Sequence, residues 1–433
     1  MKYRITTLLA TSAAAALLCA GAAWADDAPT APSEPATWVS GIKLKAQLEV
    51  GATLNPDSPN SGLNWGHAFT DRSNRVLLNG ITLTAQRDVD TSSKTLDIGF
   101  KVQASYGSDA RYTQLLGQFN RSIDSINQFD LVEANLTAHL PYLTPGGIEF
   151  KIGQYGTLEG AEVMDPSGNI FYSHSYLFNY GIPLKHTGIM TETHITPQFD
   201  LYLGVDTGVN TFLGSGGGVN DNIPHFHGGI GLNLPNVTIL ATTHIGPEDY
   251  NSGFPNPFAP TSIHNKMKYL NDIVITWTVN KKLTAILDGN YIYDETFNAS
   301  GGGVVGYLKY ALTPEVTLAA RAEVWDDADN FYVAGYPGHF DFINFEGGYG
   351  PSNPAFADKA TTYGEITLGL TYAPANLPPA FQGLMIRPEI RYDSALSGGS
   401  PFDVKYDPIS QSYFGTKKDQ FTFGIDIVAP FHL

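Results

Sequence analysis

Cysteine is nearly absent from this sequence of 433 residues, which contains only Cys19. A single cysteine cannot form an intramolecular disulfide or a multi-cysteine metal site. Basic residues are also scarce, with 25 lysines and arginines against 42 aspartates and glutamates, a formal charge of −17 at pH 7. Nucleic-acid binding requires the opposite sign of charge to neutralise phosphates, so we exclude nucleic acid as a partner.

Long hydrophobic runs are missing after the first 25 residues, although 42% of the side chains are hydrophobic. No segment there has the roughly 18 consecutive apolar residues that a transmembrane helix requires. Residues 1–25 combine a basic start, an apolar stretch and a final Ala-Trp-Ala, which together predict a cleavable export signal. The proline- and alanine-rich residues 26–38 predict a flexible periplasmic linker. Residues 39–433 then form the folded domain.

The last thirteen residues, FTFGIDIVAPFHL, show a strict alternation. Apolar side chains occupy every second position from Phe421 to Leu433, and the positions between them are mostly small or polar, with Val428 as the exception. A period of two is that of a β-strand with one apolar and one polar face. A terminal strand with such an apolar face needs a neighbouring strand to pair with, because unpaired strand edges promote aggregation. In a closed outer-membrane barrel the first strand is that partner, and the apolar face meets lipid.

Fifteen earlier stretches alternate in the same way, which makes sixteen predicted strands. They are residues 40–54, 75–87, 95–106, 129–140, 147–155, 183–195, 198–209, 225–234, 236–245, 267–279, 282–294, 303–312, 315–325, 361–372, 381–393 and 419–433. Long and short connections alternate between them, and strands of about 10–15 residues suit a tilted crossing of roughly 25–30 Å of hydrocarbon. A soluble sandwich or propeller also has strands with alternating apolar and polar residues. Neither fold predicts the alternation of long and short connections or strands of this length.

The fold class that these patterns predict is all-β. We expect a transmembrane antiparallel β-barrel of about 16 strands, within a range of about 14–18 because strand boundaries are the weakest part of such a prediction. Short turns should lie on the periplasmic side and long loops on the extracellular side. A barrel of this size leaves a water-filled lumen.

A segment beginning at Gly147, GIEFKIGQYGTLEGAEVMDPSGNIFYSHSYLFNYGIPLKHTGI, carries distinctive motifs. They are Gly-Ala-Glu-Val at 160–163, Tyr-Ser-His-Ser-Tyr-Leu-Phe at 172–178 and Pro-Leu-Lys-His-Thr-Gly at 183–188. This segment resembles the OmpL-like β-barrel porin family of Gram-negative bacteria. The sequence departs from the family pattern at His174, where the family has arginine, and Leu433 replaces the aromatic residue that usually ends an outer-membrane strand. The resemblance implies an outer-membrane barrel with pore activity and no defined substrate.

Charged residues of one long loop and of the predicted wall define a candidate pore constriction. Loop 156–182 is the third long loop, and in general trimeric porins the third long loop folds into the barrel. Acidic Glu159, Glu162 and Asp165 on this loop would then oppose basic side chains on the polar strand faces, which creates a transverse field in a narrow pore. The basic candidates are Lys43, Lys45, Lys101, Lys151, Arg321, Arg387 and Arg391. The alternative is that all of them are ordinary polar-face residues.

Histidines give a weaker candidate site for a metal ion. The short connection at Pro235 places His227 opposite residue 243 or 244, so His227 and His244 are candidate ligands of a shared zinc or copper ion. Histidine also suits a polar wall without any metal, and we therefore expect no metal and no cofactor.

Enzymatic activity is not expected either. Ser173, His174 and Ser175 bring serine and histidine together, but neighbours in a loop do not form a catalytic triad.

The function that follows is that of an outer-membrane porin, exported through the periplasm of a Gram-negative bacterium. It gives passive diffusion of small hydrophilic solutes or ions, narrowed by loop 156–182, and its net charge predicts mild cation preference. Expected partners are outer-membrane lipid, lipopolysaccharide and further copies of the chain in a homotrimer. The alternatives on the same barrel are a substrate-specific channel and a surface adhesin that binds through the aromatic-rich loop 326–360.

Overall fold

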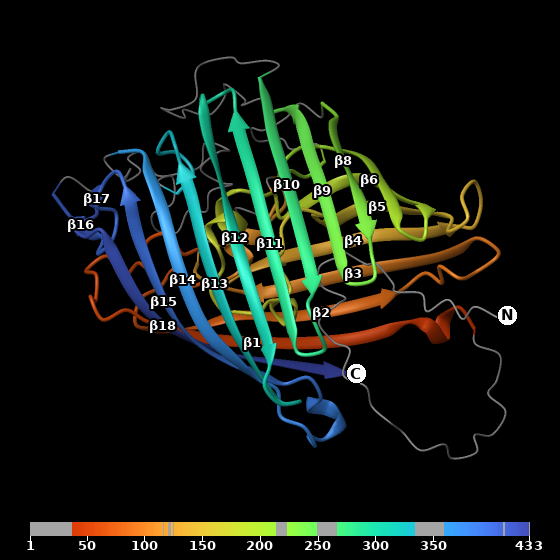
Figure 1. Cartoon of the computed structure of the whole chain (residues 1–433), viewed down its shortest axis with the longest axis horizontal. Helices are drawn as coiled ribbons and strands as arrows, with labels where there is room; N and C mark the ends of the chain where they lie inside the picture. Colours follow the sequence, from red (N-terminus) through yellow and green to blue (C-terminus); the bar gives the residue numbers. More distant parts are fainter. Residues whose placement is uncertain are drawn as a thin grey trace.

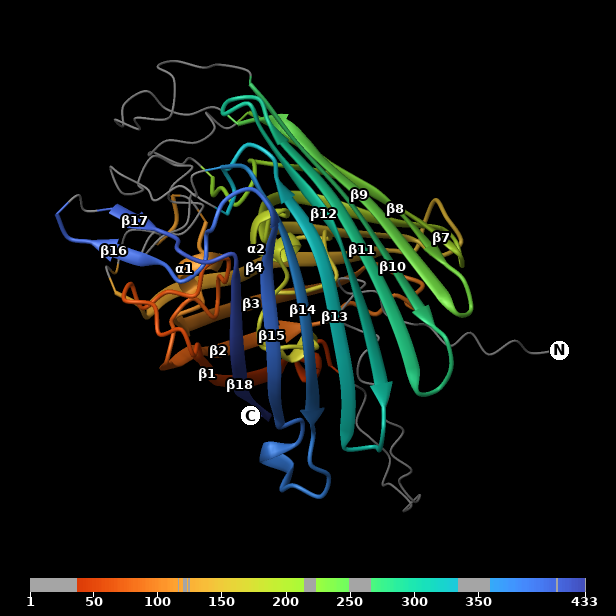
Figure 2. The same cartoon turned by 60° about the vertical axis from the view of Figure 1, so that its left-hand side comes forward.

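The computed structural model describes residues 37–432 except residues 116, 120–122, 124, 214–222, 249–265, 334–358, 410 and 411. The predicted export signal, most of the predicted linker and most of loop 326–360 lie outside the described residues. Within them, the chain forms one closed antiparallel barrel of sixteen strands, shown from two sides in Figures 1 and 2. The predicted fold class and strand number are therefore confirmed.

The barrel strands follow one another in chain order. They are β1 (Lys43–Leu54), β2 (Arg75–Arg87), β3 (Asp97–Gly107), β4 (Gln128–Leu140), β5 (Ile148–Gly156), β6 (Lys185–Thr196), β7 (Phe199–Asp206), β8 (His225–Asn233), β9 (Val237–Pro247), β10 (Met267–Thr278), β11 (Leu283–Asp294), β12 (Ala299–Ala311), β13 (Val316–Asp327), β14 (Thr361–Tyr372), β15 (Met385–Ser397) and β18 (Asp419–His432). The last strand closes the barrel on the first, with Lys45 opposite His432 and Leu54 opposite Phe423.

Short elements lie before and between the barrel strands. They are the 3-10 turns η2 (Val39–Gly41), η3 (Pro166–Gly168) and η4 (Pro379–Phe381), the helices α1 (Ala110–Thr113) and α2 (Tyr176–Tyr180), and a small hairpin of β16 (Lys405–Asp407) and β17 (Ser412–Phe414). None of the helices in the described part of the chain has the length and hydropathy of a membrane span.

Several strand boundaries differ from the sequence prediction, and one small hairpin was not predicted. The strand predicted from Phe381 begins at Met385, because residues 379–381 form the turn η4. The strand predicted from Gly303 begins at Ala299, because strand pairing needs only the backbone and continues through glycines that interrupt the apolar alternation. The hairpin β16–β17 was not predicted, since strands of three residues are too short to show a period.

Burial along the strands is the reverse of that in a soluble protein. On β18, Ile425 and Ile427 are 45% and 46% exposed, whereas Asp426 between them is 1% exposed. An apolar outer surface of this extent is stable only against another apolar phase, which for a barrel is the lipid bilayer. The polar faces of the strands point into the lumen.

Much of that lumen is filled by segments that fold inward from the loops. Figure 2 shows α2 inside the barrel, behind β13–β15. Its aromatic side chains belong to a buried cluster that also takes members from the wall and from other loops. The large aromatic members are Trp65, Phe69, Tyr112, Phe171, Tyr176, Phe178, Tyr180, Tyr307, Trp325, Phe331, Tyr332, Tyr363 and Phe402.

Candidate functional site

Residues 157–184, which we call the inward loop, connect β5 to β6 and cross the lumen to the opposite wall. Carboxylates of that wall hold the loop by its backbone. Glu323 on β13 accepts hydrogen bonds from the N–H groups of Tyr176 and Leu177, both at 2.7 Å, and Glu389 on β15 accepts one from Tyr172 at 2.9 Å. A loop that leaves the sheet has N–H groups that need partners, and here glutamates on the wall provide them.

Two more strands hold the start of the loop in the same way. Asp272 on β10 accepts a hydrogen bond from the N–H of Gly160 at 3.0 Å, and Asp288 on β11 accepts one from Ala161 at 2.7 Å. The loop is therefore attached to walls that lie far from its own strands in the sheet order.

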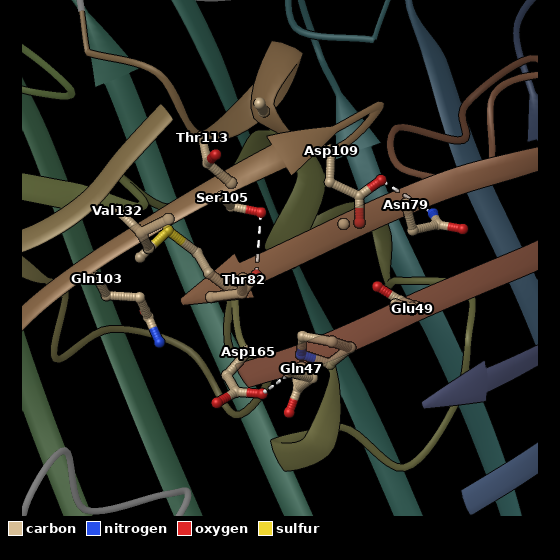
Figure 3. Close-up of a pocket in the computed structure, with 14 residues that line it drawn as sticks. Gln47, Glu49, Asn79, Thr82, Gln103, Ser105, Asp109, Thr113, Val132 and Asp165 are labelled. Atoms are coloured by element: carbon tan, nitrogen blue, oxygen red, sulfur yellow. Dashed lines mark hydrogen bonds between the residues drawn. The ribbon is translucent and has the colours of Figure 1, made fainter. Parts of the chain in front are cut away.

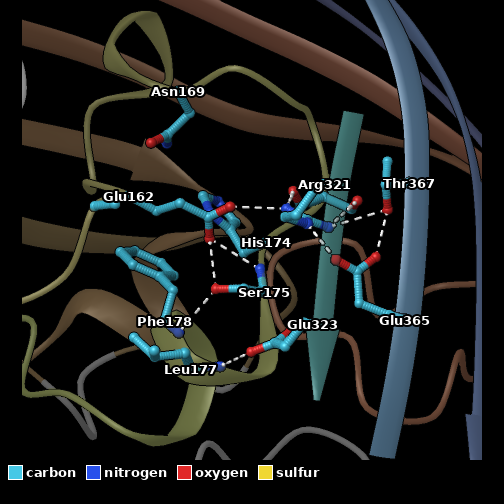
Figure 4. Close-up of polar contacts among 12 residues, drawn as sticks. Glu162, Asn169, His174, Ser175, Leu177, Phe178, Arg321, Glu323, Glu365 and Thr367 are labelled. Carbon is cyan, nitrogen blue, oxygen red and sulfur yellow. Dashed lines mark hydrogen bonds and ion pairs between the residues drawn. The ribbon is translucent and has the colours of Figure 1, made fainter. Parts of the chain in front are cut away.

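Arg321 on β13 is the centre of the polar network drawn in Figure 4. Its Nη1 lies 2.7 Å from Glu162 of the inward loop and 2.7 Å from the carbonyl oxygen of Ser173, and its Nε lies 2.6 Å from Glu365 on β14. A guanidinium group binds several acceptors at fixed angles, which suits this crossing point. Burial raises the pKa of Glu162, but Arg321 and His174 outweigh burial and lower that pKa to about 2.

Two further arginines on β15 bind loop carbonyls. Arg387 donates from Nη1 to the carbonyl oxygens of Pro166 and Asn169, at 2.7 and 2.8 Å, and pairs with Asp426 on β18. Arg391 donates to the carbonyl oxygen of His174 at 2.5 Å. Together with Arg321, they fix the loop from residue 162 to residue 174.

An open space remains between the inward loop and the wall formed by β1, β2 and β3 (Figure 3). Its volume is about 40 Å³, enough for a few water molecules. Three carboxylates line it: Glu49 from β1, Asp109 from the start of α1 and Asp165 from the loop. Asp165 accepts a hydrogen bond from Gln47 on β1 at 3.0 Å.

A smaller space of about 10 Å³ shares Glu49 and Asp109 with the first and is lined in addition by Tyr172 and Arg387. The charge of Arg387 is offset there by Asp426 and by Glu49, which lies 3.6 Å from its Nη2. Both spaces are therefore lined by the carboxyl groups of Glu49 and Asp109.

Asp109 has an unusual protonation equilibrium. Burial raises its pKa, hydrogen bonds from Asn79 and Ser108 lower it, and the result is a pKa of about 7. The Asn79 amide donates to its carboxylate at 2.9 Å. The charge beside the cavity therefore changes near neutral pH.

The predicted constriction residues separate into groups. Glu162 pairs with Arg321, Asp165 lines the cavity, and Arg387 and Arg391 bind loop carbonyls. Glu159 instead faces histidines of the wall.

Among the described residues, the predicted lysines form no ion pair with the loop acids. Lys43, at the start of β1, pairs with Asp88 at 2.8 Å, and Lys101 on β3 pairs with Glu133 at 2.6 Å. Lys45 lies opposite His432 at the periplasmic end of β1, and Lys151 lies on β5.

Several residues of the site were not singled out from the sequence. The sequence places three of them, Glu49, Glu323 and Glu389, on the polar faces of predicted strands. It carries no other indication that they belong to the site. Asp109 and Asn79 have no comparable signal, because α1 is too short to be predicted and Asn79 occupies a bulge at which the pairing of β1 with β2 shifts.

The Ser-His-Ser run takes part in packing. Ser173 Oγ accepts a hydrogen bond from Arg321 at 3.1 Å, and Ser175 Oγ accepts one from the N–H of Phe178 at the start of α2. The ring of His174 stacks on Phe178 with 4.4 Å between centroids.

The predicted histidine pair is present in the strand register, where His227 lies directly opposite His244 on β9. His186 and Asp206 lie beside them.

Comparison with known proteins agrees with this architecture. Similar solved structures include the anion-selective porin from Comamonas acidovorans (TM-score 0.55, 8% identity, 90% of this chain and 99% of that chain). Others are OprB of Pseudomonas putida (0.53, 15%, 90% and 94%) and the outer-membrane channel DcaP of Acinetobacter baumannii (0.51, 13%, 90% and 97%). At these identities the likeness is one of fold. No curated protein sequence matches the chain significantly.

The sequence pattern of the family described as "Putative beta-barrel porin-2, OmpL-like" matches residues 41–431, nearly all of the barrel. This match confirms the resemblance seen in the segment from Gly147. The chain therefore belongs to the OmpL-like β-barrel porin family and is a passive channel in the outer membrane of a Gram-negative bacterium.

Proposed function

We propose that this porin is a narrow, cation-preferring pore whose path runs between the inward loop and strands β1–β3. The observation that carries the proposal is the cavity lined by Glu49, Asp109 and Asp165. Carboxylates in a narrow, poorly screened lumen raise the local concentration of cations and repel anions.

The filled lumen supports a limit on solute size. The inward loop is bound to β10, β11, β13 and β15, and its aromatic side chains pack against those of the wall. A loop held at so many points does not swing aside on each passage, so the path admits water, ions and small hydrophilic molecules.

The two loop acids Glu162 and Asp165 differ in whether a basic side chain neutralises their charge. Glu162 is paired with Arg321, so its charge is offset within about 3 Å, where the two fields nearly cancel in the path. Asp165 has an amide partner, Gln47, and keeps its charge facing the cavity. Asp165 is therefore the loop acid that we expect to set ion preference.

The similar porin from Comamonas acidovorans is described as anion-selective. Selectivity depends on the side chains that face the path, and 8% identity carries none of them over. The acidic lining of this barrel favours the opposite preference.

The test is the reversal potential of the purified barrel in a planar bilayer under a potassium chloride gradient. Asp165→Asn keeps the size of the side chain and a carbonyl oxygen able to accept from Ser167, as Asp165 does at 2.9 Å. We expect this variant to lower the ratio of potassium to chloride permeability. Asp88→Asn, at the periplasmic turn after β2, is the matched control and should leave the ratio unchanged. An anion-preferring wild-type barrel would contradict the proposal.

The proposal also includes what surrounds the pore. The apolar outer faces are assigned to outer-membrane lipid and lipopolysaccharide, and by analogy with other sixteen-stranded porins the assembly is a homotrimer. Native mass spectrometry of the detergent-extracted protein tests the trimer.

Residues 1–25 are assigned as the export signal and residues 26–38 as the linker. Sequencing the amino terminus of the mature protein tests the cleavage site.

Catalysis has no place in this proposal. Ser173 and Ser175 are engaged by Arg321 and by the start of α2, and His174 is packed against Phe178. An absence of lipid or peptide hydrolysis by the purified barrel is the expected result.

A further inference from the structure

Four histidines from three strands meet on the inner wall between β6 and β9. His186 lies on β6, His225 and His227 on β8, and His244 on β9. The ring of His186 lies 4.3 Å from that of His227 and 5.0 Å from that of His244, measured between centroids. All four rings are buried.

Two carboxylates complete the cluster. Asp206, the last residue of β7, lies 2.9 Å from Nδ1 of His186 and 3.0 Å from Nε2 of His244. Glu159 comes from the inward loop, and its ligand atom and those of His186 and His227 all lie within 4.8 Å of one another. Among the described residues, neither carboxylate forms an ion pair with a lysine or an arginine.

The cluster contains polar atoms that protein hydrogen bonds do not use. Both ring nitrogens of His227 and Oε1 of Glu159 have no hydrogen-bond partner within the described structure. The exposed fractions of these residues are 0% and 2%. Buried polar atoms in folded proteins are nearly always paired with protein, water or an ion. A cation between His227 and Glu159 would satisfy both of them at once.

We propose that Glu159, His186 and His227 form a binding site for a divalent transition-metal ion of the zinc type. Imidazole nitrogens and carboxylate oxygens are ordinary zinc ligands, bound at about 2.0–2.2 Å. Three candidate atoms within 4.8 Å of one another come within that range of one ion by small side-chain movements. A water molecule can take the fourth position of a zinc ion.

The surroundings of His186 support its role as a ligand. Its Nδ1 faces the Asp206 carboxylate at 2.9 Å, and its Nε2 is directed to the inward loop, where it lies 3.0 Å from Oγ1 of Thr157. Carboxylate–histidine–metal arrangements use this division, in which the carboxylate fixes the ring and the other nitrogen binds the ion. Asp206 is therefore assigned as a positioning residue.

A second group, Glu192, His194 and Asp200, also brings ligand atoms together. There His194 is already bound through Nδ1 to Asp200 at 2.6 Å, and Tyr202 donates to Glu192 at 2.9 Å. Its hydrogen bonds account for that group without an ion.

A metal ion at the proposed site would join the first residues of the inward loop to β6 and β8. The other attachments of the loop are to strands β10, β11, β13 and β15 and to β1. The ion would therefore add an attachment on the side of β6 and β8. The metal site is independent of the ion preference proposed above, because none of its residues lines the acidic cavity.

Isothermal titration with zinc chloride tests the proposal on the full-length barrel, refolded in detergent and purified without a histidine tag. We expect one zinc ion per chain. His227→Ala should weaken binding by at least the roughly 10- to 100-fold that loss of a supporting residue costs. His139→Ala is the matched control, because His139 is also a buried wall histidine without hydrogen bonds at either ring nitrogen and has no place in a ligand group. It should bind zinc like the wild type.

Glu159→Gln is the second variant, since it changes only a loop side chain and leaves every strand intact. It should also weaken zinc binding, and it keeps the test valid if His227→Ala fails to fold. Cobalt absorption gives an independent readout, with an intense visible band for a four-coordinate site that both variants lose. A wild-type barrel that binds no zinc, or zinc binding that survives in the folded variants, overturns the proposal.

Discussion

The guanidinium group of Arg321 lies 2.7 Å from the carboxylate of Glu162, and these side chains are 0% and 6% exposed. The pair joins the barrel wall to the inward loop across the lumen. Because both charges are buried, each depends on the other: removing one partner of a buried pair leaves an uncompensated charge and typically costs about 3–5 kcal/mol.

Arg321→Met should therefore destabilise the barrel by roughly 3–5 kcal/mol and release the middle of the inward loop, because Glu162 and Glu365 both lose the guanidinium group that they share. Urea unfolding in lipid vesicles measures the first effect. Single-channel conductance measures the second, and it should increase as the loop gives way. Lys43→Met is the control, since the Lys43–Asp88 pair is largely exposed and its loss should cost less than about 1 kcal/mol. Unchanged conductance in Arg321→Met would show that the loop does not depend on this arginine.

Gly51 on β1 faces the ring of Tyr172, and a Cβ atom there would lie 2.3 Å from Cζ of that ring. Gly51→Ala should push Tyr172 away from the wall and break its 3.1 Å hydrogen bond to Asn79. The tyrosine lies in the smaller acidic space, so conductance should change as well. Gly289→Ala on β11 is the control, because its nearest contacts would be 3.6 Å away. If Gly51→Ala conducts like the wild type, as Gly289→Ala should, the position of Tyr172 does not affect conductance.

Much of the barrel is predictable because strand periodicity is local. The alternation from Phe421 to the end of the chain predicts β18 without knowledge of any other strand. The pairing of His227 with His244 is also predictable, since only a short turn separates their strands. His186 and Asp206 join the same cluster across further strands, and no local pattern places them there.

The inward loop shows the limit of this reasoning. Arg321 and Glu162 are each recognisable as charged residues of the wall and loop, but 159 positions separate them. Their pairing depends on the path of the loop, which alternation does not encode. Glu323 was overlooked for a related reason: a glutamate on a polar face looks the same in sequence whether it binds water or the N–H groups of α2.

The pKa of Asp109, about 7, predicts a pH-dependent ion preference. An aspartate with a raised pKa is neutral below that value and negative above it. Cation preference should therefore increase between about pH 6 and pH 8 as Asp109 loses its proton. Reversal potentials measured across this range test the expectation, and Asp109→Asn should remove the pH dependence while keeping a preference from Asp165. A dependence that persists in Asp109→Asn would assign the titration to another group.

Neighbouring residues on β2 distinguish the two faces of the wall. Leu83 is 56% exposed on the outer surface, whereas Thr82 lines the cavity and hydrogen-bonds to Ser105 at 3.0 Å. Leu83→Arg should destabilise the barrel in lipid vesicles by up to about 2–4 kcal/mol, because it places a charge in the hydrocarbon, while lumen substitutions alter selectivity. Thr82→Arg is the matched change: it should shift the reversal potential toward chloride with a smaller effect on urea unfolding. If the two variants exchanged these effects, the outer and inner faces of the barrel would be assigned the wrong way round.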